Sequence, residues 1–348
     1  MPSKIEELLK DKNDKIEYDK LLSDPNHTWI VKKNNYCVIS PDSDGILCGL
    51  FMSYYLNWKV VGFYDGKVMV VNKDAIKERP SFLDMEIFRN NVNSIGQHML
   101  LLNKNKIPEK WIQFEHSINP NNMRLIDGKH TFRLKYPLAT IHLLVSIIAY
   151  HFNKQGHKII IPQSAIPPLF FTDGVFNVLF SYPENVLNWL NYLRVNEDWN
   201  PLKEIFESRE YTVFTLMIKM HDFFRKRDEI SYHKERGDRI KLSEKDGTTF
   251  NIRMNANEDY FIDKNASERI IRFIRILSDL TGWRYDEDAW LWDKMKLYIF
   301  TKGDFAKDKL TITDKNFEAF ISSKNPLSWA MTSGKNIEYT IESPDKIF

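Results

Sequence analysis

The sequence predicts an α/β protein in which helices flank a mostly parallel sheet, followed by a C-terminal α+β domain. Strand-like and helix-like apolar segments alternate up to about residue 200, which is typical of a sheet covered by helices. Beyond residue 205 the pattern changes to a charged stretch and a long amphipathic helix. With 348 residues the chain exceeds a usual single domain. We therefore divide it into an N-terminal helical segment (1–25), an α/β domain (26–203) and a C-terminal α+β domain (204–348) for substrate or partner binding.

The elements of the first two parts follow from hydrophobic periodicity. Apolar residues among alternating charges predict a surface helix or helix pair over Lys4–Leu22. In the α/β domain, short β-branched and aromatic runs predict strands, and longer apolar runs predict helices. The expected strands are Trp29–Lys32, Tyr36–Ile39, Lys59–Tyr64, Lys67–Val71, Ser81–Leu83 and Lys158–Ile161, and the expected helices are Ile46–Asn57, Pro137–His151 and Pro183–Leu193.

The C-terminal part contains fewer and more widely spaced elements. Apolar residues at helical spacing predict a helix over Ala266–Leu280. The charged stretch Lys234–Gly247 is the best candidate for a mobile loop. Candidate strands follow at Leu297–Phe300, Leu310–Ile312 and Ile337–Ile341.

Composition limits the cellular setting. The net charge is +2, from 49 basic and 47 acidic residues, so any site for a polyanion must be local. The two cysteines, Cys37 and Cys48, fall in apolar segments and suit reduced thiols. The stretch Met1–Asp24 is charged throughout and predicts no secretory signal, and the longest apolar run, Leu138–Tyr150, is too short for a bilayer. We expect a cytoplasmic protein with no membrane partner.

An acidic pair provides the most informative local signal. Asp42 and Asp44 follow the apolar strand Tyr36–Ile39 and precede an apolar helix. Ligands of open α/β sheets bind at this edge, and a carboxylate pair beside a helix N-terminus suits a divalent cation that carries phosphate. Gly45 permits a sharp turn. The alternative is that the two aspartates are only a turn residue and an N-cap.

Three further segments could bring ligands to the same edge. The strand Ser81–Leu83 ends at Asp84, a weakly apolar run contains His98, and a third apolar run leads to Asp173. Carboxylate oxygens with one imidazole suit Mn²⁺ or Mg²⁺ better than the thiolates of structural zinc sites. We therefore expect a metal site formed by Asp42, Asp44, Asp84, His98 and Asp173.

The order of these segments resembles the DHH phosphoesterase superfamily, which includes RecJ-like exonucleases, oligonucleotide and cyclic-dinucleotide phosphodiesterases, and pyrophosphatases. Ser40-Pro41-Asp42-Ser43-Asp44-Gly45 is similar to the first motif and Asp84 to the second. Gly96-Gln97-His98 stands at the Asp-His-His signature, and Asp173 stands at the final aspartate. The resemblance spans residues 36–174.

The resemblance implies a phosphodiesterase or nuclease with up to two Mn²⁺ or Mg²⁺ ions that activate a water. Asp42 and His98 would be catalytic, in addition to their roles as metal ligands. The substrate would be nucleic acid or a small nucleotide. The chain departs from the family pattern at Ser40, Gly96 and Gln97, each of which removes a possible ligand or hydrogen-bond partner. The alternative is a catalytically impaired binding module in a larger assembly, and a homo-oligomer is also possible.

Other polar residues could contact the substrate. We assign Gln97, Arg133 and Lys135 to substrate binding, the last two as charge-assisted donors to phosphate. Basic residues interleaved with aromatic residues between Phe223 and Arg236 could follow a nucleic-acid backbone, although such a cluster is more often a solvated helix end.

A rival reading starts from the same acidic pair. An Asp-x-Asp-Gly sequence after a strand is also typical of haloacid-dehalogenase-like phosphatases, in which Asp42 would be the nucleophile. That family needs a downstream lysine and an acidic pair, which the sequence does not place convincingly.

Overall fold

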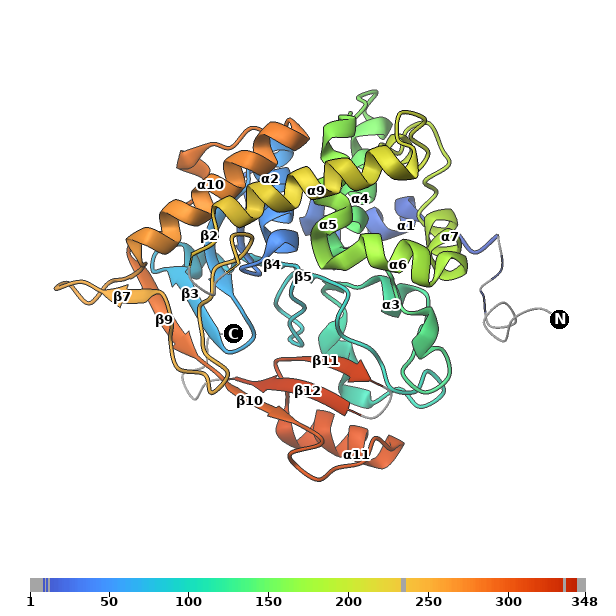
Figure 1. Cartoon of the computed structure of the whole chain (residues 1–348). Coiled ribbons are helices and arrows are strands. Elements are labelled where there is room, and N and C mark those ends of the chain that lie inside the picture. Colours follow the sequence, from blue (N-terminus) through green and yellow to red (C-terminus); the bar gives the residue numbers. More distant parts are fainter. Residues whose placement is uncertain (1–8, 10, 12, 233–235, 334–335, 343–348) are drawn as a thin grey trace.

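The computed structural model describes residues 9, 11, 13–232, 236–333 and 336–342. Within these residues, nine strands form one sheet in the order β6-β5-β4-β1-β2-β3-β9-β8-β7 (Figure 1). The strands are β1 (Tyr36–Ile39), β2 (Lys59–Tyr64), β3 (Val68–Asn72), β4 (Ser81–Leu83), β5 (Ser94–Ile95), β6 (Ser117–Ile118), β7 (Ile252–Met254), β8 (Tyr260–Ile262) and β9 (Met295–Ile299).

The sheet is parallel in one half and antiparallel in the other. Pairing is parallel from β6 through β5, β4 and β1 to β2, and antiparallel from β2 through β3, β9 and β8 to β7. The predicted α/β class with flanking helices is confirmed. The strands β7, β8 and β9 come from beyond residue 203, so the sheet crosses the predicted domain boundary.

Helices cover the sheet, and a small second sheet lies at the C-terminal end (Figure 1). This sheet has the order β10-β12-β11, with β10 at Thr301–Asp304, β11 at Ser328–Ser333 and β12 at Asn336–Ile341. Every helix in the described part of the chain is too short or too polar to cross a lipid bilayer. The α-helices are α1 (Tyr18–Ser23), α2 (Ser43–Leu56), α3 (Pro120–Met123), α4 (Thr140–Lys154), α5 (Ile166–Phe171), α6 (Val175–Ser181), α7 (Pro183–Tyr192), α8 (Leu202–Phe206), α9 (Val213–Glu229), α10 (Lys264–Thr281) and α11 (Asp314–Ala319).

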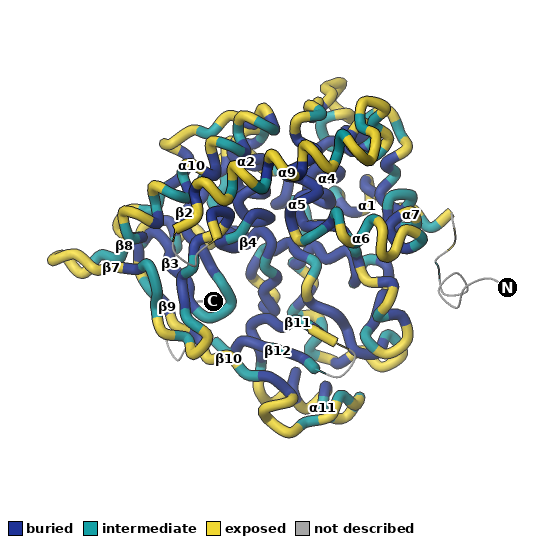
Figure 2. The backbone as a smooth tube through the Cα atoms, in the orientation of Figure 1, coloured by how far each residue is buried: buried dark blue, intermediate teal, exposed yellow. Residues whose placement is uncertain are grey.

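Both faces of the central strands are buried, as expected for a parallel sheet between two layers. In β1, Cys37 and Ile39 belong to the larger apolar core, whereas Val38 belongs to a smaller core on the other face. The same alternation occurs in β3, where Val70 and Val71 lie in different cores. Figure 2 shows β3 as buried and α9 as largely exposed.

Four predicted elements differ from the structure. Trp29–Lys32 is a 3₁₀ turn (Thr28–Val31), and the predicted helix Lys4–Leu22 is reduced to α1 among the residues described. Lys158–Ile161 is irregular and pairs with no strand of the described residues. Its isoleucines alternate in burial, with Ile160 73% exposed and Ile159 and Ile161 buried, which imitates a strand pattern. Leu310–Ile312 also lacks a ladder partner.

Candidate metal centre

The site lies where the order of the parallel strands reverses. The chain leaves β1 through α2 toward β2, whereas β4 pairs with β1 on the other side. The carboxyl ends of β1 and β4 therefore border a switch point, which is where open α/β sheets bind ligands. The amide of Ser40 donates to the carbonyl of Leu83 over 3.3 Å and extends this pairing to the first residue of the acidic loop.

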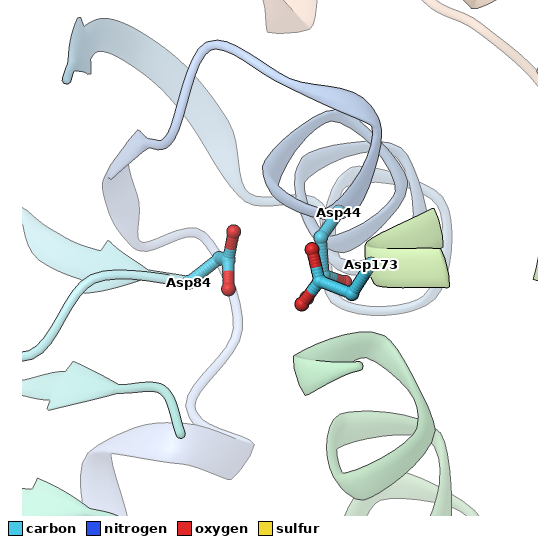
Figure 3. A group of neighbouring side chains, drawn as sticks. All are labelled: Asp44, Asp84 and Asp173. Carbon is cyan, nitrogen blue, oxygen red and sulfur yellow. The ribbon is translucent and has the colours of Figure 1, made fainter. Parts of the chain in front are cut away.

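Three of the predicted ligands converge at this point. One carboxylate oxygen from each of Asp44, Asp84 and Asp173 lies within 4.8 Å of the others. Asp44 comes from the first turn of α2, Asp84 follows β4, and Asp173 lies in the turn Thr172–Gly174 before α6. Figure 3 shows Asp44 and Asp173 side by side and Asp84 facing them. We call these residues the aspartate trio.

Asp42 and Asp44 begin α2 in different ways. The helix begins at Ser43 rather than at Ile46, and Asp42 is its N-cap, with Oδ1 accepting from the amides of Asp44 (3.2 Å) and Gly45 (3.4 Å). Asp44 instead caps another helix: its oxygens accept from the amides of Thr140 (2.7 Å) and Ile141 (3.0 Å) in α4. The N-terminal end of α4 therefore stabilises the buried Asp44 carboxylate.

Gly45 is required by close packing and not by its backbone angles, because it lies inside α2. A Cβ at this position would lie 2.3 Å from the carbonyl oxygen of Ser40. The absence of a side chain thus lets the first turn of α2 approach the end of β1.

Asp84 is held by hydroxyl groups on both sides. Its Oδ1 accepts from Thr140 Oγ1 over 2.7 Å. Ser40 Oγ lies 2.6 Å from Asp84 Oδ2 and 2.9 Å from Asp42 Oδ1, and since a hydroxyl has one proton, the shorter distance favours donation to Asp84. Asp84 and Asp173 both adopt left-handed backbone conformations, with φ of 61° and 53°. Aspartate and asparagine accept this region more readily than most residues.

The pKa values reflect carboxylates crowded together, of which Asp44 and Asp84 are buried, Asp42 is half-buried and Asp173 is exposed at the rim of the site. Burial, and then the charges of Asp84 and Asp173, raise the pKa of Asp44. Removal from water and the charge of Asp84 likewise raise the pKa of Asp42 to about 6 and that of Asp173 to about 7. A cation between these carboxylates would relieve their mutual repulsion.

The pKa values of His98 and Asp84 shift in the directions that favour their charged forms. The Nε2 atom of His98 lies 3.6 Å from Asp84 Oδ1. Burial alone would lower the pKa of His98, but Asp84, Glu86 and Asp173 together raise it to about 10. Burial would raise the pKa of Asp84, but the nearby charge of His98 and the hydroxyl groups of Ser40 and Thr140 lower it below its ordinary value. His98 and Asp42 line the same cavity as Asp84, but they are not part of the trio that converges within 4.8 Å.

A cavity of about 690 Å³ opens beside the trio. Its lining includes Asp42, Asp84, His98 and Asp173. The lining also includes five cations, which we call the basic wall: Lys67, Arg236, Arg239, Lys241 and Lys245, with the acids Asp65, Asp238 and Glu244 beside them. Carboxylates that suit a hard cation and side chains that can donate to phosphate thus border one cavity.

The predicted substrate-binding residues are placed differently. Gln97 Nε2 donates to Asp173 Oδ2, so this side chain reaches the trio. Arg133 and Lys135 are exposed and lie outside the lining of this cavity. Lys135 instead stacks over Phe132, with Nζ 5.2 Å from the ring centre. Of the basic cluster between Phe223 and Arg236, only Arg236 lines the cavity among the described residues, and residues 233–235 lie outside the described part.

Two features of the candidate site escaped the sequence analysis. The first is the basic wall, since most of its residues come from the stretch predicted as a mobile loop. The second is Glu86, a buried carboxylate whose Oε1 accepts from the amide of Met99 over 3.0 Å. A Cβ at Gly96 would lie 2.5 Å from Glu86 Oε2, so the two residues share one space. The short spacing between Asp84 and Glu86 is the one sequence signal that pointed to the latter.

Comparisons with protein families, curated protein sequences and solved structures gave no match for this chain. The resemblance to the DHH phosphoesterases therefore stays a prediction that rests on the order of the motif-like segments.

Proposed function

We propose that this protein is a divalent-metal-dependent phosphodiesterase that acts on nucleic acid or a small nucleotide. The observation that carries the proposal is the convergence of Asp44, Asp84 and Asp173 within 4.8 Å at the switch point of the sheet. The adjoining basic wall supplies a reason for an anionic substrate to enter the same cavity.

The donor set fits a hard cation. Three carboxylates offer oxygen ligands and no thiolate, and a cation would relieve the mutual repulsion that contributes to the raised pKa values of Asp44 and Asp173. We assign the ion, Mn²⁺ or Mg²⁺, to the trio, with Asp42 and His98 beside it. When bound, such an ion polarises a phosphoryl oxygen and lowers the pKa of water.

The protein's own residues would then orient the reaction. Asp84 is fixed by Ser40 and Thr140, and Asp44 by the first amides of α4, so neither carboxylate needs to reorganise on binding. His98, whose pKa is about 10, would be protonated at neutral pH and could donate a hydrogen bond to a phosphate oxygen from Nδ1 or Nε2. Gln97 holds Asp173 in position.

The direct test is a hydrolysis screen with Mn²⁺ on single-stranded DNA, RNA, short oligonucleotides and cyclic dinucleotides. It compares the native protein with Asp84→Ala and with a control, Asp222→Asn, at an exposed residue outside the cavity. We expect hydrolysis of at least one substrate by the native protein and the control, and a loss of about a hundredfold or more in Asp84→Ala. Equal activity of Asp84→Ala in a folded sample would remove Asp84 from the mechanism.

A second candidate function is binding without hydrolysis. It is favoured by the hydrogen bonds that already engage both oxygens of Asp44 and of Asp84, and by Gly96 at the position of a signature acid. Phosphodiester binding that persists without turnover in Mn²⁺, Mg²⁺ and Co²⁺ would select it. In that case we infer a role within a larger assembly or a homo-oligomer.

We also propose that the protein works in the cytoplasm. The support is that Cys37 and Cys48 are both buried free thiols, which suit a reducing compartment. Localisation of a tagged full-length chain by microscopy would test this directly.

A further inference from the structure

The segment from Arg236 to Lys245 is built into the wall of the cavity. The amide of Ile240 donates to the carbonyl of Pro41 over 2.8 Å, which ties the segment to the loop that carries Asp42. Ser243 Oγ donates to Asp65 Oδ2 over 2.5 Å, and Lys67 Nζ donates to the carbonyl of Glu244 over 2.6 Å. These contacts hold the segment against the ends of β1, β2 and β3.

The segment contributes both buried and exposed residues to the cavity lining. Ile240 and Leu242 are buried, whereas Arg239 and Lys245 are exposed, and all four border the cavity. A Cβ at Gly237 would lie 2.3 Å from the carbonyl oxygen of Arg227 at the end of α9, so the chain passes that helix without room for a side chain. Arg239 and Lys245 are therefore accessible to a molecule in the cavity.

Three cations of the wall already have partners. Arg236 forms a two-point ion pair with Asp238 through Nε (2.9 Å) and Nη2 (2.6 Å), which leaves Nη1 for a further contact. Lys241 Nζ lies 2.5 Å from Glu244, and Lys67 contacts the Glu244 carbonyl. In contrast, the side chains of Arg239 and Lys245 form no hydrogen bond or ion pair with another described residue.

No cation of the wall is within ion-pair distance of the trio in the described structure, although Asp84 and Asp173 line the same cavity as the wall. Arg236 of the basic wall and Asp42 interact electrostatically and without direct contact. The hydrogen bond to Asp238 raises the pKa of Arg236 most, and the charge of Asp42 raises it more weakly. Opposite charges held apart in one cavity leave room for a molecule that contacts both.

The lining also limits how that molecule is recognised. Phe171 is the one aromatic side chain among the described lining residues. Proteins that grip bases of single strands use several aromatic platforms together with a basic groove. The described lining of this cavity has the basic side chains but not a set of aromatic platforms.

Resting on the proposed function, we propose that Arg239 and Lys245, beside the fixed Arg236, bind the phosphate groups that adjoin the attacked one. The substrate is therefore a phosphodiester chain held by its backbone and not by its bases. Arg236 contributes its free Nη1 atom, and Asp238 keeps the guanidinium in place.

The test measures binding in EDTA, so that neither metal nor hydrolysis is needed. The probes are a labelled oligothymidylate of about six nucleotides and a phosphodiester chain of the same length made of abasic units. Fluorescence anisotropy compares the native protein with the double variant Arg239→Gln/Lys245→Gln. The charge-matched control is Arg209→Gln/Lys219→Gln, at two exposed cations outside the cavity lining.

We expect the two probes to bind the native protein within about threefold of each other, and the double variant to bind both about tenfold or more weakly. The slope of log affinity against log salt should fall by about 1.4, because two phosphate contacts are lost. The control should bind like the native protein. Asp173→Asn should bind the probes more tightly than the native protein, since it removes one repelling charge while asparagine keeps the left-handed backbone.

The proposal is overturned if the native protein and Asp173→Asn both fail to bind the abasic chain, or if the double variant keeps native affinity. It is also overturned if affinity falls with an unchanged salt slope, because that result indicates a structural effect. If the hydrolysis screen failed but binding remained and still depended on Arg239, the proposed function would be refuted. The proposal that the basic wall binds phosphate groups would then be supported.

Discussion

The carboxylate of Glu86 fills the space that a side chain at position 96 would need, with Oε2 only 2.5 Å from a Cβ built on Gly96. Glu86 cannot easily yield, because Oε1 accepts from the amide of Met99 and from Asn119 Nδ2 (2.5 Å) in a fully enclosed environment. Glycine at position 96 therefore has a local structural cause: the absence of its side chain leaves room for the Glu86 carboxylate.

We expect Gly96→Ala to lower the free energy of unfolding by about 1–3 kcal/mol, because the added methyl group displaces the buried Glu86 carboxylate. Urea unfolding followed by circular dichroism measures this change. In a Glu86→Ala background the same substitution should cost much less, since the obstacle is gone. Equal costs in both backgrounds would contradict the shared space.

We expect Asp84→Asn to weaken Mn²⁺ binding by about tenfold or more, because it removes one of three charged ligands while asparagine accepts the left-handed backbone at this position. Isothermal titration calorimetry with Mn²⁺ measures the affinity. Asp222→Asn, at an exposed residue outside the cavity, is the matched control and should bind like the native protein. Native affinity in Asp84→Asn would place the ion elsewhere.

We expect Thr140→Val to destabilise the fold by about 1–3 kcal/mol, because the buried Asp84 carboxylate loses the hydroxyl that donates to Oδ1 over 2.7 Å. Thermal and urea unfolding give the difference. Thr140→Ser keeps the hydroxyl and should lose much less stability. If valine kept native stability and serine lost it, the hydrogen bond would contribute little and methyl packing would explain the threonine.

In EDTA we expect Asp173 to make the fold less stable as the pH rises from about 4 to 7. Its pKa is about 7 in the folded protein, raised by loss of water and by Asp84, whereas an unfolded aspartate has a pKa of about 3.9. The folded state therefore binds the proton more tightly in this window, and its stability decreases as the proton leaves. The pH slope of unfolding free energy should be flatter in Asp173→Asn.

The same protons compete with the metal. Because carboxylate ligands must be ionised, Mn²⁺ affinity of the native protein should increase from pH 5.5 to 8, through the pKa of about 6 for Asp42 and about 7 for Asp173. Calorimetric titrations across this range measure it. An affinity that stays flat would exclude both carboxyl groups from the ion's environment.

The sequence could predict the parts of the site that strand ends determine. Asp44 and Asp84 follow neighbouring parallel strands, and the carboxyl ends of such strands meet at one edge. It could not predict that Ile240 would bond to Pro41, because that contact joins segments about two hundred residues apart and leaves no local pattern. The false strand Lys158–Ile161 has a similar cause: its residues have strand propensity, but no neighbouring strand offers hydrogen bonds.

The pairing of β3 with β9 runs from Val68 opposite Ile299 to Asn72 opposite Met295. A polypeptide cut near residue 203 would lose this partner and expose the backbone amides and carbonyls of β3 to other chains. Neither half should then behave as an autonomous unit, yet the two produced together could reassociate along this ladder. The protein is therefore a candidate for fragment complementation. In such an experiment, recovery of the native fold would report that the two halves had associated.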